Sequence, residues 1–592
     1  MTVYKNREEI AEKYKWCLGD IVSSLVQWEK LYDESKSEID CCLKYKGKLN
    51  NPEILLECLD LETALSRKLT TLYCYAMLRS DENVANSSNL ALKDRVYRLF
   101  VTLSSNNSYI VTEISNIDSS VIESLIKDKR FENYDVMLKN IIREKPHILS
   151  EAEEKILSET SLFASSFKET FSGLNNADLK FDSFIDEDGN ELELTNGNYG
   201  VYLQSQSRDI REKAFNSCCK SYKSFINTIV SNYAGSVKKD CFYAKVRNYE
   251  SALAQSMSSE NVNVNAYNKL LHNINANVDS MHRYIKLRKR VLGVDKIHMY
   301  DLYTPLVQNA EIKVEYDEAY KLVIEALAPL GKEYTDIIEK AHYSNWIDVY
   351  ENEGKRSGAY SCGIYGTHPY VLLNYTKTTH DVFTIAHEMG HAMHSYYSNK
   401  SQTYRKADYE IFVAEVASTV NEILLLKYLS KTADKGTKKY LLSYLLDTIR
   451  TTIFRQTMFA EFEVEAHNMV EKEIPLTKDS LNDMYYKLNV KYYGEEVSDE
   501  DIKYEWARIP HFYTSFYVYK YATGLTSAIM IVDKILTDKS YVKKYYEFLK
   551  AGCSLPPLDI LRLVDVDLES DAPYESVMKL FSDTVSELEE LL

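Results

Sequence analysis

The 592-residue sequence contains few glycines and prolines, 18 and 10 respectively. Because both residues interrupt helices, their scarcity beside plentiful Glu, Lys and Leu favours long helices. The N-terminal stretch MTVYKNREEIAEKY lacks the apolar run of a signal peptide. The most apolar late stretch, TGLTSAIMIV at residues 523–532, is too short to span a bilayer. We therefore expect a mainly helical protein that does not interact with a membrane.

The chain also lacks an excess of positive charge, since its formal net charge is −17. A nucleic-acid binder needs a basic face, so we expect no nucleic-acid partner. The strongest basic run, KLRKR at residues 286–290, follows a helical pattern and is expected to form a solvated helix face. The ten cysteines are scattered without a C-x-x-C pair, which argues against a small disulfide-stapled secreted domain. These features predict a cytoplasmic protein.

Two breaks interrupt the helical pattern. In the first, at residues 181–200, Asp188-Gly189 lies between short runs of strand-forming residues and predicts a hairpin. We take this break as the boundary between an N-terminal helical domain, 1–180, and a second domain, 181–592. The second break, at 352–376, is Gly-rich and ends in a compact apolar run that predicts a strand. Such a strand could pair with the backbone of a bound peptide.

Four of the chain's twelve histidines fall within THDVFTIAHEMGHAMHSYY, residues 379–397. His387 and His391 are four positions apart, which is slightly more than one helical turn, so both rings leave the same face. Two imidazoles placed this way can bind one metal ion, for which Zn–N distances are about 2.0–2.1 Å. His380 and His394 each lie seven positions from His387, one before it and one after it, so we expect them to be structural and not ligands.

The glutamates near these histidines suggest a catalytic metal site. Glu388 follows the first histidine, as in the H-E-x-x-H motif, where the carboxylate can reach a metal-bound water without binding the metal. A catalytic zinc requires a third protein ligand and an open position. Spacing alone leaves Glu410 and Glu415 as nearly equal candidates. Glu415 and Glu422 share one helix face, which could offer one carboxylate to the metal and another to orient a ligating imidazole.

At this point the sequence resembles oligoendopeptidase F, within the wider thimet-oligopeptidase-like zinc metallopeptidases. The resemblance covers about residues 180–592, while the N-terminal third matches mainly in being helical. Cys362 stands where an aromatic residue is expected. The matching segments are KLRKRVLGVDKIHMYDLYTPL, GKRSGAYSCGIYGTHPYVLLNYT, DVFTIAHEMGHAMHSYYS, IFVAEVAST followed by VNE, and WARIPHFYTSFYVYKYATG.

The resemblance implies a fold, a cofactor and an activity. The fold would be a large two-lobed helical zincin with a small β-sheet beside the active-site helix and a deep central channel. One Zn²⁺ per chain would be held by His387, His391 and Glu415, with Glu388 as the general base. The activity would be endopeptidase cleavage of short peptides. We expect a monomer, with a weak homo-oligomer as the alternative.

The resemblance also implies that the segment HFYTSFYVYKY, residues 511–521, supplies a His and one or two Tyr to the reaction. By position these are His511 and Tyr517, with Tyr513 and Tyr521 as further options. These groups would donate hydrogen bonds to the oxyanion of the tetrahedral intermediate. Because the chain has 48 tyrosines, a Tyr-rich segment can equally be packing.

Two alternatives remain open at the level of the sequence. A zinc aminopeptidase or carboxypeptidase could use Glu410 as its third ligand, and an aminopeptidase would need a carboxylate cluster for the substrate amine, which we do not recognise. A non-catalytic peptide-binding protein with a structural zinc would usually have four protein ligands. Such a protein would have no use for Glu388 as a base.

Overall fold

A computed structural model describes residues 4–307 and 313–592 of the chain. The structure is 71% helical and its sheets are small, so the prediction of a mainly α fold is confirmed. Among the described residues, we find no helix whose length and hydropathy would let it cross a bilayer.

The chain forms two compact units, each assembled from three segments. Unit 1 contains Met1–Pro146, Glu311–Lys427 and Ile531–Asp565, and unit 2 contains His147–Ala310, Tyr428–Met530 and Val566–Leu592. The segments of the two units alternate along the chain. This division differs from the two domains predicted from the sequence, 1–180 and 181–592, which stay a prediction. Each unit is described by itself below.

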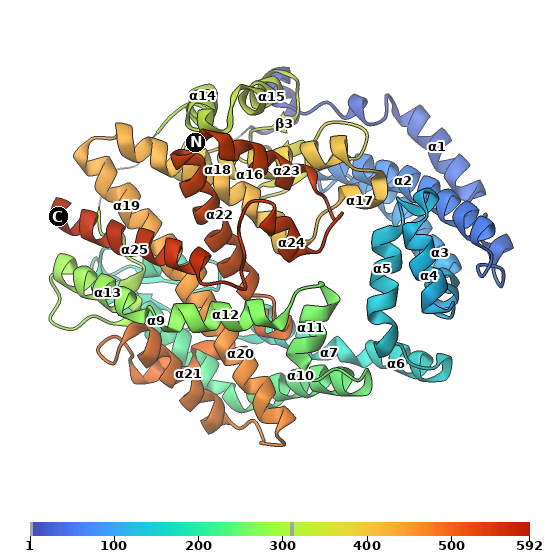
Figure 1. The fold of residues 1–592 in the computed structure, drawn as a ribbon. Coiled ribbons are helices and arrows are strands. Elements are labelled where there is room, and N and C mark those ends of the chain that lie inside the picture. The colour runs from blue at the N-terminus through green and yellow to red at the C-terminus, as the bar shows by residue number, and fades with distance from the viewer. Residues whose placement is uncertain (1–3, 308–312) are drawn as a thin grey trace. The chain divides into compact units, whose positions relative to one another are not determined.

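Unit 1 combines an N-terminal group of helices with the helices and strands around the His-rich segment (Figure 1). Helix α18 begins in unit 1 and ends in unit 2, and α22 begins in unit 2 and ends in unit 1. The elements are α1 (Leu25–Ser37), α2 (Pro52–Asp81), α3 (Ser87–Ser115), α4 (Ser119–Lys127), α5 (Asp135–Glu144), α14 (Tyr316–Ala326), α15 (Lys332–Tyr343), β3 (Ile347–Asp348), β4 (Tyr360–Cys362), β5 (Tyr370–Leu372), α16 (Thr379–Ser401), α17 (Tyr404–Ala407), α18 (Ile411–Thr432), α22 (Tyr519–Thr537), α23 (Val542–Lys550) and α24 (Pro557–Arg562).

Unit 2 is built almost entirely of helices. Its elements are α6 (Glu151–Ala164), α7 (Ser166–Gly173), β1 (Phe184–Ile185), β2 (Glu191–Leu192), α8 (Tyr199–Leu203), α9 (Arg208–Ser224), α10 (Ile226–Val246), α11 (Ala252–Ser259), α12 (Val264–Asn275), α13 (Val278–Leu292), α19 (Lys435–Ile449), α20 (Arg455–Glu471), α21 (Lys478–Tyr493) and α25 (Ala572–Leu591). The strands β1 and β2 pair in antiparallel register across Asp188-Gly189, which confirms the predicted hairpin.

The basic run at 286–290 lies on α13, but one of its residues is not solvated as expected. Arg288 is completely buried and donates to the hydroxyl of Tyr284 at 3.0 Å and to the carboxylate of Asp447 at 3.2 Å. Burying a guanidinium is costly unless it is hydrogen-bonded, and this one also donates to the backbone carbonyl of Thr304. The expectation of a fully solvated face was therefore wrong at this position.

A three-stranded sheet lies against the His-rich helix α16 in unit 1. Its order is β3-β5-β4, with β3 parallel and β4 antiparallel to β5. Both β4 and β5 contact α16, so the small sheet beside this helix is confirmed. The predicted strand is β5, but β5 is the central strand and its backbone is already paired on both sides. The edge strands are β3 and β4, so a peptide could pair only with one of these two.

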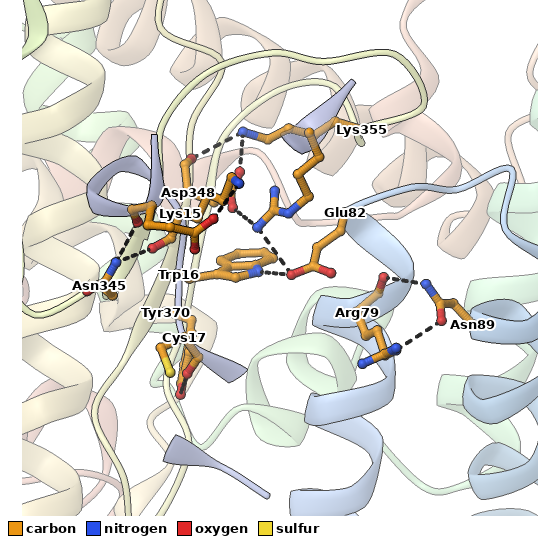
Figure 2. A network of polar contacts seen from close by, with 12 residues as sticks. Lys15, Trp16, Cys17, Arg79, Glu82, Asn89, Asn345, Asp348, Lys355 and Tyr370 are labelled. Carbon is orange, nitrogen blue, oxygen red and sulfur yellow. Dashed lines mark hydrogen bonds and ion pairs between the residues drawn. The ribbon is translucent and has the colours of Figure 1, made fainter. Parts of the chain in front are cut away.

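A buried polar network fixes the N-terminal segment and the Gly-rich segment to this sheet (Figure 2). Nζ of Lys355 lies 2.7 Å from a carboxylate oxygen of Asp348, and both side chains are almost completely buried. Arg7 pairs with the same carboxylate, and Trp16 Nε1 donates to Glu82 at 2.8 Å. The pairing offsets part of the cost of burying these charges, and the contacts connect both segments to the sheet.

Candidate metal centre

Helix α16 begins at a capping box. The hydroxyl of Thr378 accepts a hydrogen bond from the backbone N–H of Asp381 at 3.2 Å, and the Asp381 carboxylate accepts from the backbone N–H of Thr378 at 2.8 Å. These bonds satisfy backbone donors that a helix start leaves unpaired. Helix α16 runs to Ser401, so the H-E-x-x-H residues lie within one regular helix, as the spacing predicts.

Two ring nitrogens and one carboxylate oxygen form a small triangle. The Nε2 atoms of His387 and His391 are 3.1 Å apart. Oε2 of Glu415 lies 3.5 Å and 3.6 Å from these two atoms, respectively. Tetrahedral ligands at about 2.0–2.1 Å from a metal ion lie about 3.3–3.4 Å from one another. The three side chains could therefore hold a metal ion, and they form the one such His, Cys, Asp and Glu group found among the described residues.

Glu415 reaches the triangle because α18 packs very close to α16. A Cβ atom placed on Gly390 would lie only 2.4 Å from the Cα atom of Ser418, so no larger residue fits there without a shift. Asn421 links the same two helices, since its Nδ2 donates to the carbonyl of Ala386 at 3.0 Å. The metal group thus depends on a close contact between two helices as well as on the spacing within one.

Neither Gly390 nor Asn421 was predicted from the sequence to be part of the site. A signal for the glycine was available, because glycine inside a helix costs about 1 kcal/mol relative to alanine and needs a packing reason. Asn421 carries no comparable signal, since its partner lies 35 positions away in the sequence.

A second carboxylate on the Glu415 face orients one of the histidines. Nδ1 of His387 donates a short hydrogen bond to Oε1 of Glu422. With its proton held on Nδ1, the ring presents Nε2 to the triangle. The prediction that Glu415 and Glu422 could divide these two tasks agrees with this arrangement.

The two histidines differ in their affinity for protons. Burial lowers the pKa of His387, but the hydrogen bond and charge of Glu422 outweigh burial and raise that pKa to about 9. Burial lowers the pKa of His391 to about 4, and the neighbouring His387 acts in the same direction. A metal ion binds neutral imidazole, so metal binding at this site would release a proton from the pair.

Glu388 is buried beside the triangle, with only 6% of its surface exposed. Its Oε2 atom is buried and has no hydrogen-bond partner in the structure. Burial raises the pKa of this carboxyl to about 7, helped by the charges of Glu415 and Glu422 and opposed by His387. A carboxyl in this environment can both take up and release a proton near neutral pH.

The other residues of the His-rich segment lie outside the group. His394 is buried and stacks on Tyr409 with ring centroids 3.8 Å apart, and burial lowers its pKa to about 3. His380 is exposed in the first turn of α16. Glu410 precedes α18 and is not a member of the metal group. The geometry therefore favours Glu415 over Glu410, which spacing could not separate.

His511 and Tyr517 belong to unit 2, where they form an aromatic cluster with Tyr521. The rings of His511 and Tyr517 have centroids 6.2 Å apart, and the Tyr521 hydroxyl lies 3.4 Å from Nε2 of His511. All three side chains are partly exposed. Tyr513 differs, because it is buried and stacks on Phe171 with centroids 4.6 Å apart. The structure thus brings His511, Tyr517 and Tyr521 together, whereas Tyr513 is buried against Phe171.

The donor set fits a metal ion by two independent criteria. The spacing of the triangle matches tetrahedral ligands, and two imidazoles with one carboxylate are ligands that Zn²⁺ accepts. The unpartnered Oε2 atom of Glu388 is a buried acceptor beside the group, where a water on the metal could serve as its partner.

Comparisons with known proteins show the family to which the chain belongs. Residues 201–580 match Peptidase family M3, and residues 113–181 match the family described as Oligopeptidase F. The chain is 43% identical to Oligopeptidase PepF of Bacillus subtilis, over 99% of this chain and 88% of that protein. It is 36% identical to an Oligoendopeptidase F homolog of Lactococcus lactis, over 99% of each chain.

Two solved structures are similar to this chain in both sequence and fold. The crystal structure of a peptidase from Chlamydophila abortus is 35% identical and superimposes with a TM-score of 0.96, covering 100% of both chains. The crystal structure of oligoendopeptidase-F from Enterococcus faecium is 34% identical with a TM-score of 0.73, covering 95% of this chain and 98% of that one.

Proposed function

The chain belongs to peptidase family M3 and is a metalloendopeptidase, and from this premise we propose that it cleaves internal bonds of short peptides with Zn²⁺ as its metal. The observation that carries the proposal is the triangle of His387, His391 and Glu415, whose atoms have the separations of tetrahedral ligands. In this proposal the three residues hold one ion per chain and leave one position for solvent. The chain is expected to act as a monomer in the cytoplasm.

Zn²⁺ bound there would lower the pKa of a water from about 15.7 to about 7 and polarise the scissile carbonyl. The chain's own contribution to the proton transfers is Glu388. Its carboxylate takes a proton from the attacking water and later delivers it to the leaving amine nitrogen. The pKa of about 7 suits both directions of transfer near neutral pH.

Glu422 has a positioning role in this proposal. By accepting from Nδ1 of His387, it keeps the ring in the tautomer whose Nε2 can bind a metal. The close approach of α16 and α18 at Gly390 keeps Glu415 within ligand distance of both histidines.

His511 and Tyr517 are assigned to the oxyanion of the tetrahedral intermediate. Their support is the resemblance together with the cluster that they form with Tyr521 in unit 2. One well-placed donor of this kind is worth about 2.7–4 kcal/mol of transition-state stabilisation.

The experiment compares peptides blocked at both termini with their unblocked forms, with products identified by mass spectrometry and metal measured on the same protein. We expect internal cuts by the zinc-loaded wild type. The Glu388→Gln variant should keep its zinc and lose turnover by about 10²–10⁴-fold, the usual contribution of a general base. Products only from unblocked peptides would indicate an exopeptidase instead, and full turnover by Glu388→Gln would exclude Glu388 as the base.

A further inference from the structure

Unit 1 contains a cavity of about 510 Å³ to which the metal centre contributes no residue. It is lined by the short helical turn at Asp20, the end of α15, the loop before β5 and the last turns of α16. Ligand pockets of about 300–1,000 Å³ are typical for small molecules. The side chains used in the argument below are Asp20, Lys340, Trp346, His368, Tyr396 and Lys400.

One wall of the cavity is a rigid stack of rings. His368 lies parallel to Trp346, with centroids 4.8 Å apart and planes at 3°, and its ring also stacks on Tyr370 with centroids 4.4 Å apart. The hydroxyl of Tyr370 donates to the carbonyl of Cys17, which ties the stack to the N-terminal segment (Figure 2). The wall is therefore held by packing and hydrogen bonds from several elements.

The one carboxylate lining the cavity is already engaged. Oδ2 of Asp20 lies 3.2 Å from Nε2 of His368, whose Nδ1 lies 2.7 Å from the carbonyl oxygen of Pro369. Both ring nitrogens thus face acceptors, and Asp20 is directed to the histidine. Its carboxylate therefore lies beside His368 and forms no ion pair with either lysine that lines the cavity.

Lys340 and Lys400 supply positive charge without an acidic partner. Within residues 4–307 and 313–592, neither ammonium group forms an ion pair with a carboxylate, although the chain carries a net charge of −17. Nζ of Lys400 lies 5.6 Å from the ring centre of Tyr396, another lining residue. Each lysine lies in the last turn of its helix, where a cation is favoured by the helix dipole. The dipole explains each lysine singly, but not why both line the same cavity.

We propose that this cavity binds a small organic anion through its carboxylate or phosphate group. Lys340 and Lys400 would pair with the anion, and the aromatic side chains Trp346 and Tyr396 would border its body. Charge-assisted hydrogen bonds are the strong ones in proteins, and lysine ammonium groups can donate them to either kind of anion. The site is separate from the peptidase chemistry, since none of its residues belongs to the metal group.

The experiment is calorimetric titration of the full chain with benzoate, phenyl phosphate and inorganic phosphate. Benzoate and phenyl phosphate distinguish a carboxylate from a phosphate headgroup, and inorganic phosphate tests the headgroup alone. We expect at least one organic probe to bind the wild type, and the Lys340→Gln/Lys400→Gln variant to bind it about tenfold more weakly for each lysine removed.

The matched control is Lys332→Gln/Lys550→Gln, which removes the same charge from two lysines that do not line the cavity. This variant should bind like the wild type. Equally weakened probe binding in both variants would mean that the effect comes from net charge alone, and it would overturn the proposal. Absence of binding by the wild type at ~10 mM of every probe, far above the range of a specific site, would also overturn it.

Discussion

The metal group and the His511 cluster use similar residue types but are held in different ways. In the first, His387 and His391 are fixed 3.1 Å apart on one helix and joined by Glu415 from a tightly packed neighbour. In the second, His511 and Tyr521 approach to 3.4 Å from a short 3₁₀ helix and the start of an α-helix, and their side chains are partly exposed. The first arrangement follows from helix geometry, whereas the second depends on local packing.

The largest expected effect is loss of the metal group. We expect His391→Ala to lose bound zinc and, with it, turnover down to the level of metal-stripped wild type, because two remaining ligands hold a metal ion poorly. Metal analysis and turnover on blocked peptides check this result. The control is His380→Ala, an exposed histidine on the same helix, which should keep both zinc and activity. Retention of zinc by His391→Ala would remove this residue from the ligand set.

The next effect tests the second cluster. We expect Tyr517→Phe, and separately His511→Gln, to lower kcat by about 10²–10³-fold with unchanged zinc content, because each removes one donor to the oxyanion. The control is Tyr513→Phe, whose ring is buried against Phe171 and should leave kcat nearly unchanged. If the Tyr513 variant lost activity and the Tyr517 variant did not, the two tyrosines would have to exchange roles.

These two regions also show how far the sequence alone could lead. The H-E-x-x-H spacing predicts the placement of both imidazole rings, because helix periodicity puts them on one face. The seven-residue spacing of Glu415 and Glu422 likewise predicts that both carboxylates share one helix face. The choice of His511 and Tyr517 came from resemblance, because a chain with 48 tyrosines offers no periodic signal that marks one of them.

Contacts between distant segments set the limit of prediction. The strand at Tyr370 was predicted, but its central place between β3 and β4 depends on pairing with residues far along the chain. The burial of Arg288 depends on Asp447, which lies 159 positions away. Local patterns cannot report such partners, although they fixed the helices, the hairpin and the ligand spacing.

Substitution of Glu422, which contacts His387 but is not a member of the metal group, is expected to have a smaller effect. We expect Glu422→Gln to weaken zinc binding or activity by about 10–100-fold, the usual cost of removing a group that orients a ligating histidine. Competition with a metal chelator measures the affinity. Glu410→Gln, outside the metal group, is the control. An unchanged zinc affinity in Glu422→Gln would mean that the contact with His387 has no positioning role.

The smallest effect on turnover is expected at Gly390, where helix propensity and packing act in opposite directions. Alanine inside a helix is favoured over glycine by about 1 kcal/mol, so Gly390→Ala would stabilise an isolated α16. In the folded chain, however, the new Cβ would lie 2.4 Å from Cα of Ser418. Overpacking against backbone costs about 1–3 kcal/mol, so packing should decide the sign.

We therefore expect Gly390→Ala to lower the free energy of unfolding and to weaken zinc binding, because α18 must move away and take Glu415 with it. Denaturant unfolding and zinc titration measure the two effects. Gly200→Ala is the control, since this helical glycine has no atom within 4 Å of its added Cβ and should be neutral or slightly stabilising. If Gly390→Ala were as stable as the control and bound zinc normally, close helix packing would not be what sets the metal group apart from the His511 cluster.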